Sequence, residues 1–159
     1  YVGLMIKNNE PYLIEYNIRM GDPECQVILP RLKTDLIKII KNTIENKLKQ
    51  TKIEWKKDKS MTIVLCSKGY PGNYKRNSII KNLDKIKLSK KQFIFHAGTK
   101  LVNGQLLSNG GRVLNITSIG KNFLNIRNNI IKIIKRLNWK PGFYRKDIGW
   151  RVINKNAHN

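Results

Sequence analysis

Apolar residues along this chain occur in runs of four or fewer, such as residues 63–66, and charged or turn-forming residues separate these runs. A helix that crosses a membrane needs about 18 consecutive apolar residues. We therefore expect no membrane helix and no membrane partner. Runs of this length suit short strands and the inner faces of helices. A chain of 159 residues is long enough for one full domain or slightly more.

The first 52 residues are predicted to form a strand pair followed by two helices. Two apolar segments, 2–6 and 12–18, are separated by a turn-forming stretch. Asp22 and Pro23 are typical of a helix start, with Asp22 as the capping residue, and Pro30 ends that helix. Thr34 is expected to cap a second helix, which extends to about Lys49. Its apolar stripe consists of Ile37, Ile40, Ile44 and Leu48.

A charged stretch without periodicity, residues 51–60, indicates a boundary between a first domain at 1–52 and a second at 53–159. The second domain is predicted to be a small α+β unit. Asn103 and Gly104 are typical of a tight hairpin turn, and a helix is expected at 123–137. The expected strands are residues 61–66, 92–99, 100–102, 105–107 and 112–116.

The net charge of +22 raises the question of a nucleic-acid partner. The chain has 24 Lys, 23 Ile and 19 Asn, whose codons are rich in A and T, so biased codon usage is a simpler explanation. Lys also outnumbers Arg threefold, whereas nucleic-acid readers favour Arg. We expect no specific nucleic acid as partner. The two cysteines, Cys25 and Cys66, are not spaced as a disulfide framework or as zinc ligands. They fit a protein of the reducing cytoplasm.

The segment from Leu13 to Arg19 alternates as a strand does, which places Glu15, Asn17 and Arg19 on one face and apolar residues on the other, core-facing side. A carboxylate beside an amide oxygen suits a hard cation such as Mg²⁺. Arg19, next to Glu15 and Asn17 on the same face, is suited to hold a phosphate. A plain solvated sheet face explains the same alternation, so the pattern alone leaves both interpretations open.

Five ordered blocks resemble the carboxyl-terminal part of the phosphoribosylamine-glycine ligases, also called glycinamide ribonucleotide synthetases, of the ATP-grasp superfamily. The blocks are IEYNIRMGDPECQ at 14–26, GYPGNY at 69–74, FHAGT at 95–99, NGGRVL at 109–114 and FYRKDIGWR at 143–151. The resemblance implies a fold in which the end of an ATP-grasp core subdomain precedes a small mixed α/β carboxyl-terminal domain. Tyr16 stands where the family has Phe, a change that keeps the aromatic ring.

The resemblance implies an ATP-dependent ligase that joins glycine to 5-phosphoribosylamine through a glycyl phosphate. Its cofactors are ATP and Mg²⁺, or Mn²⁺. By position in the family motif, Glu15 and Asn17 bind the metal. Arg19 and Asp22, beside the metal strand, are expected to face phosphate or substrate, Arg19 as the catalytic residue and Asp22 as a substrate contact, with a pure helix cap as the alternative for Asp22. Gly110, Gly111 and Arg112 are expected to bind a phosphate or ribose of the substrate through backbone N–H groups and the guanidinium; a turn followed by a strand with an exposed Arg is the alternative. Two interpretations from other classes remain: a basic nucleic-acid-binding module, and another ligase of the ATP-grasp superfamily.

The family also has an amino-terminal half that carries a flexible glycine-containing loop over the ATP phosphates. No such loop leads into a helix in this sequence. We therefore expect this chain to be a fragment, with the amino-terminal half of the same protein as its partner. We also expect the isolated fragment to be inactive. His96, in an alternating apolar segment, is interpreted as a structural histidine and not as a general base.

Overall fold

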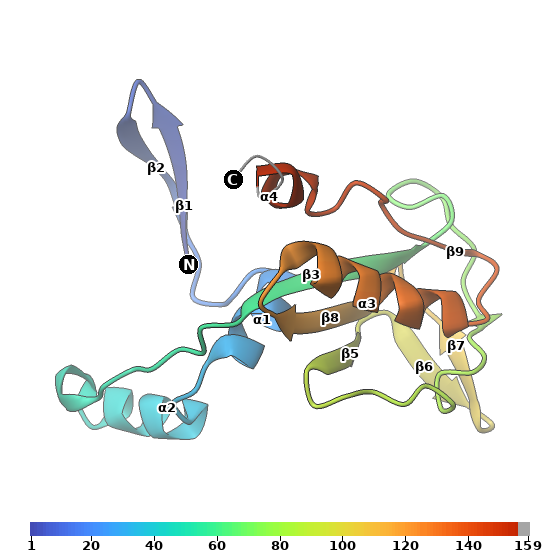
Figure 1. Cartoon of the computed structure of the whole chain (residues 1–159), viewed down its shortest axis with the longest axis horizontal. Helices are drawn as coiled ribbons and strands as arrows, with labels where there is room; N and C mark the ends of the chain where they lie inside the picture. Colours follow the sequence, from blue (N-terminus) through green and yellow to red (C-terminus); the bar gives the residue numbers. More distant parts are fainter. Residues whose placement is uncertain (156–159) are drawn as a thin grey trace.

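The computed structural model describes residues 1–155, and its centre is a four-stranded antiparallel sheet (Figure 1). The strand order is β5-β8-β3-β9, and the long strands β3 and β8 pair side by side, with Ile63 opposite Ile116. Because residues directly opposite share a face, this register gives the sheet one continuous apolar side. The strands are β3 (Lys59–Ser67), β5 (Gln92–His96), β8 (Arg112–Gly120) and β9 (Gly142–Phe143).

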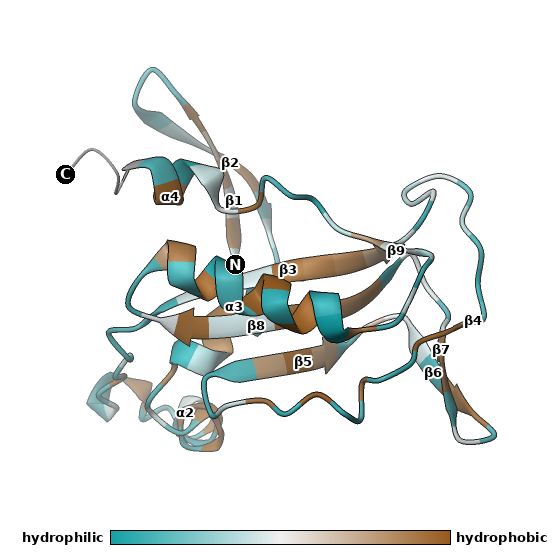
Figure 2. Ribbon diagram, turned by 45° about the vertical axis from the view of Figure 1, so that its right-hand side comes forward, coloured by the Kyte–Doolittle hydropathy of each residue, from teal (hydrophilic) through white to brown (hydrophobic). Residues whose placement is uncertain are grey.

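Helix α3 (Phe123–Arg136) covers the apolar side of this sheet. Its side chains at 126, 130 and 133 are buried, as helical spacing of three and four residues requires. Figure 2 shows the apolar side of the helix turned to the sheet and the hydrophilic side turned outward. Asn122 caps the helix by accepting a hydrogen bond from the Asn125 backbone N–H. The expected helix at 123–137 is thus confirmed to within one residue.

Short helical segments lie on the opposite side of the sheet. Helix α1 (Glu24–Ile28) and the 3₁₀ helix η1 (Leu29–Arg31) contact β3, and α1 also contacts β8. This side carries hydroxyl groups: Thr117 donates to the Thr62 hydroxyl at 2.9 Å, and Thr62 donates to a backbone carbonyl oxygen. The two sides of the central sheet are therefore different: one is covered by the apolar side of α3, and the other is partly polar.

A second, three-stranded sheet in the order β4-β7-β6 adjoins the first. Its strands are β4 (Ser78–Ile79), β6 (Thr99–Val102) and β7 (Gln105–Ser108). The turn between β6 and β7 has positive φ angles of 49° at Asn103 and 75° at Gly104. Asn-Gly is the sequence that suits two consecutive positive φ angles, so the predicted hairpin is confirmed.

The amino-terminal hairpin, β1 (Val2–Lys7) with β2 (Glu10–Tyr16), projects from the body of the molecule (Figure 1). The prediction of two strands is confirmed, but the expectation that one face of the second strand is core is wrong. Ile14 and Tyr16 are 62% and 74% exposed, and Ile18, beyond the strand, is fully exposed. Two strands alone cannot enclose a core.

Helix α2 (Leu36–Ile44) and the 3₁₀ helix η2 (Leu48–Gln50) form a second projection. The expected cap at Thr34 is wrong by one residue, because Asp35 accepts the hydrogen bond from the Lys38 backbone N–H. The Thr34 hydroxyl instead accepts from the Glu54 backbone N–H. The helix ends before Lys49, since Asn46 has a φ of 57°, outside the helical region.

The first helix also starts differently from the prediction. Pro23 occupies the N-cap position of α1, and no side chain caps that helix. Asp22 is therefore not a capping residue, and its carboxylate is free for another contact. The chain closes with α4 (Trp150–Lys155).

The buried apolar residues of the described chain all lie between Met61 and Trp139. Neither the hairpin nor α2 contributes to them. The boundary near residue 52 stays a prediction. Within residues 1–155, no helix has the length and apolar character needed to cross a bilayer.

Candidate functional site

A pocket of about 540 Å³ lies where the segment after the hairpin meets the central sheet. It brings together three of the residues singled out in the sequence, Arg19, Asp22 and Arg112. The first two belong to the loop between β2 and α1, and the third begins β8. The remaining lining residues are Tyr1, Met20, Gly21, Pro23 and Glu24.

An ion pair joins the two sides of this pocket. The Arg112 guanidinium lies 3.1 Å from the Asp22 carboxylate through Nη2, and its Nη1 donates to the Asp22 backbone carbonyl at 3.0 Å. Both side chains are less than half exposed. Because Asp22 does not cap α1, its carboxylate is available to orient Arg112.

Arg19 has no carboxylate partner within the described residues. Its Nη1 donates to the neighbouring Met20 carbonyl at 3.2 Å, a local contact that leaves most guanidinium donors unused. Two guanidinium groups on one pocket form a site suited to an anion, because each offers several N–H donors in a fixed plane. Asp22 and Glu24 also line the pocket, so its suitability for a phosphate or carboxylate group rests chiefly on Arg19, whose donors are largely unused.

The predicted metal residues, Glu15 and Asn17, lie beside this pocket and do not line it. Tyr1 connects them to it: its hydroxyl donates to Glu15 at 3.3 Å, and its backbone exchanges hydrogen bonds of 2.8 and 2.9 Å with Asn17. β2 ends at Tyr16, so Arg19 lies in a bend and the expected strand to residue 18 is too long. Tyr1 carries no motif signal, and sequence reasoning missed its place in the site.

The side chains of Glu15 and Asn17 offer carboxylate and amide oxygens, the donor types that Mg²⁺ takes. The Asn17 Nδ2 is buried and makes no hydrogen bond. Within residues 1–155, no three His, Cys, Asp or Glu side chains are clustered closely enough to hold an ion. A cation on Glu15 and Asn17 therefore needs further ligands, such as phosphate and water oxygens.

Gly110 and Gly111 have a packing role that the sequence did not reveal. A Cβ at Gly111 would lie 2.0 Å from the Tyr70 ring, and one at Gly110 would lie 2.9 Å from the Gly98 Cα. A larger residue at Gly111 therefore requires the Tyr70 ring to move, and one at Gly110 requires the backbone to move. The paired glycines let Tyr70 press against the chain just before Arg112. Tyr70 stands in the GYPG block, where the sequence indicated only a turn.

An apolar pocket of about 380 Å³ shares Pro23 with the candidate site, and its walls include Tyr70, Phe143 and Cys66. The thiol of Cys66 is partly buried there. Burial raises the pKa of the Cys66 thiol above its ordinary value, and the nearby Arg112 guanidinium partly opposes this by lowering it.

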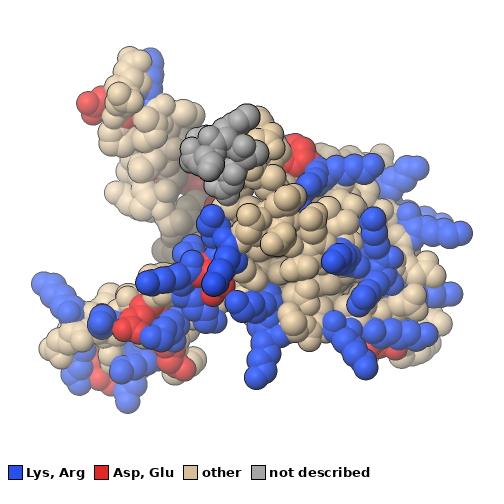
Figure 3. Space-filling model, viewed as in Figure 1, with Lys and Arg blue, Asp and Glu red and all other residues tan. Residues whose placement is uncertain are grey.

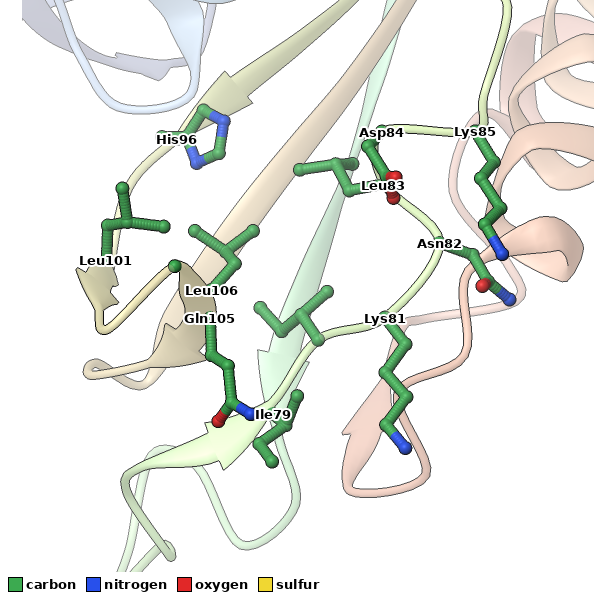
Figure 4. A pocket seen from close by; sticks show the side chains of 12 residues that line it. Ile79, Lys81, Asn82, Leu83, Asp84, Lys85, His96, Leu101, Gln105 and Leu106 are labelled. Atoms are coloured by element: carbon green, nitrogen blue, oxygen red, sulfur yellow. The ribbon is translucent and has the colours of Figure 1, made fainter.

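A third pocket, of about 630 Å³, lies between the loop at 79–85 and the β6–β7 hairpin (Figure 4). Its inner wall is aliphatic, with side chains such as Leu83 and Leu106, and the lysines at its edge point away. His96 lies at this pocket, exposed, with its Nδ1 2.9 Å from the Thr99 hydroxyl. None of the predicted site residues lines this pocket.

The family model described as "Phosphoribosylglycinamide synthetase, C domain" matches residues 60–151. This chain belongs to the phosphoribosylglycinamide synthetase family. The matched range contains Gly110, Gly111 and Arg112.

Curated relatives named phosphoribosylamine-glycine ligase align with nearly the whole chain. The phosphoribosylamine-glycine ligase of Agrobacterium fabrum is 44% identical over 153 residues, which is 96% of this chain and 36% of the relative. That of Brucella melitensis is 40% identical over 159 residues, all of this chain and 37% of the relative. The chloroplastic enzyme of Arabidopsis thaliana is 42% identical over 159 residues, which is 98% of this chain and 30% of the relative. The chain thus spans about a third of the length of these relatives.

A solved structure has the same fold. The crystal structure of phosphoribosylamine-glycine ligase from Thermotoga maritima aligns with a TM-score of 0.70 and 28% identity, over 92% of this chain and 35% of that chain. The α+β fold and the arrangement of its carboxyl-terminal domain are therefore confirmed.

Proposed function

We propose that this chain forms part of an ATP-dependent ligase that joins glycine to 5-phosphoribosylamine and so makes glycinamide ribonucleotide. The single observation that carries the proposal is the convergence of Arg19, Asp22 and Arg112 on one pocket. The names and near-complete alignment of the relatives support the choice of substrates. In the relatives, the matched region is about a third of the protein, so we assign the complete reaction to this chain together with the remainder of such a ligase.

In the proposed reaction, the glycine carboxylate attacks the γ-phosphorus of ATP, and ADP leaves. The amine of phosphoribosylamine then attacks the carbonyl carbon of glycyl phosphate, and inorganic phosphate leaves with the bonding electron pair. Both steps spread negative charge over oxygens, which fixed guanidinium groups stabilise in a partly enclosed site. We assign this role to Arg19.

We assign phosphate or ribose binding to Arg112, with Asp22 holding its guanidinium in place before substrate arrives. The backbone at Gly110 and Gly111, where the Tyr70 ring packs against Gly111, is proposed to let a substrate come close to this segment. An incoming phosphate competes with Asp22 for Arg112, because both are anions that suit the same planar donors.

Glu15 and Asn17 are proposed to hold a divalent cation, Mg²⁺ or Mn²⁺. Their oxygen donors fit such an ion, which would neutralise charge on the ATP phosphates when bound. We place the activity in the cytoplasm, where the thiols of Cys25 and Cys66 remain reduced.

The test is a chimeric ligase in which this chain replaces the matching 36% of the Agrobacterium fabrum relative. ADP release is measured with glycine and phosphoribosylamine, singly and together. We expect turnover only with both, and we expect Arg112→Met and Arg19→Met each to lower it about a hundredfold. A control variant, Arg76→Met, removes an exposed guanidinium outside the pocket.

The proposal is overturned if the chimera folds with the secondary structure of the parent but shows no dependence on both substrates. Replacing glycine by alanine or serine separates this reaction from that of another ATP-grasp ligase. Turnover that favours one of those amino acids over glycine contradicts the assigned substrate.

A further inference from the structure

The acidic residues are distributed unevenly along this chain, whereas the Lys residues are distributed evenly. Residues 1–58 carry 9 Lys and 8 Asp or Glu, whereas residues 59–159 carry 15 Lys but only 2 Asp or Glu. Biased codon usage explains a uniform density of Lys. It does not explain why carboxylates are nearly absent from one part of the same chain, with none between Asp84 and Asp147. The depletion marks that part as a surface for an anion.

Seven exposed basic residues lie on α3, on the segment just after it and on the loop at 81–87, in which Asp84 is the one acidic residue. Lys81 and Asn138 exchange backbone hydrogen bonds of 3.1 and 3.2 Å, which joins the loop at 81–87 to the segment after α3. Figure 3, in which α3 faces the viewer, shows Lys and Arg over this side and few acidic groups. We define the α3 basic surface as Lys81, Lys85, Lys87, Lys132, Lys135, Arg136 and Lys140.

All seven side chains are exposed, and none pairs with a carboxylate within residues 1–155. The surface is separate from the candidate site. α3 covers the apolar side of the sheet, whereas Pro23 and α1 lie on the other side. Attraction of small substrates into the Arg19 pocket therefore does not account for these charges.

We propose that the α3 basic surface binds the phosphate backbone of a nucleic acid, without sequence specificity. The exposed positions over the last turns of α3 are Asn128, Asn129, Lys132, Lys135 and Arg136. Lys, Arg and Asn are residues that contact phosphate oxygens, and Asn also reaches base edges. The last turns of α3 expose no aromatic or aliphatic side chain, and Leu88, next to Lys87, is 40% exposed. A protein partner needs such anchors at the centre of its interface, so the surface suits a nucleic acid better.

The test uses the 159-residue chain and a fluorescein-labelled 24-base-pair DNA duplex and a 24-nucleotide RNA, followed by fluorescence anisotropy. The logarithm of the binding constant should fall linearly with that of the salt concentration, with a slope near −0.9 for each duplex phosphate contacted. The variant Lys81→Gln/Lys85→Gln/Lys132→Gln/Lys135→Gln is expected to weaken binding at least tenfold and to flatten the slope.

A matched control removes the same charge from the other part of the chain, Lys7→Gln/Lys38→Gln/Lys49→Gln/Lys57→Gln. All eight lysines are exposed and make no ion pair in the described residues, so both variants should fold. Circular dichroism checks that they do. The proposal is overturned if the two variants lose affinity equally. It is also overturned if poly-glutamate of the same charge competes as well as the duplex, since the surface then prefers no nucleic acid.

Discussion

Arg112 and Asp22, 90 residues apart in sequence, are joined by an ion pair of 3.1 Å and a backbone hydrogen bond of 3.0 Å. Asp22 lies in the loop before α1, and Arg112 begins the central strand β8. The contact holds the loop that carries Arg19 against the carboxyl-terminal domain. It also keeps one guanidinium in a fixed position at the mouth of the candidate site.

This ion pair is expected to contribute little to stability, because both side chains are 40% or more exposed. Exposed pairs typically give about 0.2–1 kcal/mol in double-mutant cycles. We therefore predict a coupling energy in this range for Asp22→Asn and Arg112→Gln, measured by urea unfolding. A coupling well above this range would show that the pair is a structural support and not a readily exchanged contact.

Gly111→Ala should destabilise the fold, because its Cβ would lie 2.0 Å from the Tyr70 ring. Overpacking of this kind typically costs about 1–3 kcal/mol. The loss should shrink when Gly111→Ala is made together with Tyr70→Ala, which removes the clashing ring. Equal losses in both backgrounds, measured by chemical denaturation, would contradict the packing role given to Tyr70.

The Cys66 thiol should titrate above its ordinary range, since burial raises its pKa. Only the thiolate reacts with iodoacetamide. In a Cys25→Ser background, the rate of alkylation is therefore expected to rise with pH at a higher midpoint than that of a free thiol. Arg112→Gln removes the charge that favours the thiolate, so the midpoint should move higher still. A midpoint unchanged by Arg112→Gln would show that the guanidinium does not act on Cys66.

The raised pKa also fixes the direction of a small effect on stability. Below the unfolded pKa, the thiol is neutral in both the folded and the unfolded states, so it contributes no pH dependence. As the pH rises above the unfolded pKa, the unfolded state loses its proton first, and the folded state loses stability. Cys66→Ser should abolish this part of the pH dependence in urea unfolding between neutral and alkaline pH.

Glu15→Gln, made in the chimeric ligase, is predicted to lower turnover and to raise the Mg²⁺ concentration needed for half-maximal rate. The amide keeps the shape of the side chain but removes the negative charge that attracts the cation. Glu10→Gln, on the same hairpin strand but at its far end, is the matched control. An unchanged Mg²⁺ requirement in Glu15→Gln would contradict the assigned metal role.

Loss of an apolar side chain should cost much more stability in the central sheet than in the projecting hairpin. Ile116 is fully buried, so Ile116→Ala is expected to cost about 2–5 kcal/mol. Ile14 is 62% exposed, and Ile14→Ser should change the unfolding free energy by about 0.5 kcal/mol or less. A large loss for Ile14→Ser in urea unfolding would mean that the hairpin packs against the body in solution.

Local sequence patterns determined the elements whose cause is itself local. The Asn103-Gly104 turn follows from the positive φ angles that these residues accept, and α3 follows from apolar side chains at helical spacing. Alternation placed Glu15, Asn17 and Arg19 on one face, but it left a plain solvated sheet face equally open, and the metal role of Glu15 and Asn17 came from the resemblance to the ligase family. Helix ends were predicted less well, because neighbouring residues such as Thr34 and Asp35 compete for the same capping role.

The tertiary structure alone decided which residues meet. Asp22 was interpreted as a helix cap or a substrate contact. It does not cap α1, and the fold gives its carboxylate to Arg112, a partner too distant in sequence for any local pattern to reveal. The paired glycines before Arg112 were interpreted as a phosphate contact, and the ring of Tyr70 gives them a packing reason as well. The apolar residues of the hairpin stay exposed because the fold buries none of them. Alternation determines which side chains share a face, whereas burial depends on what the rest of the fold places against that face.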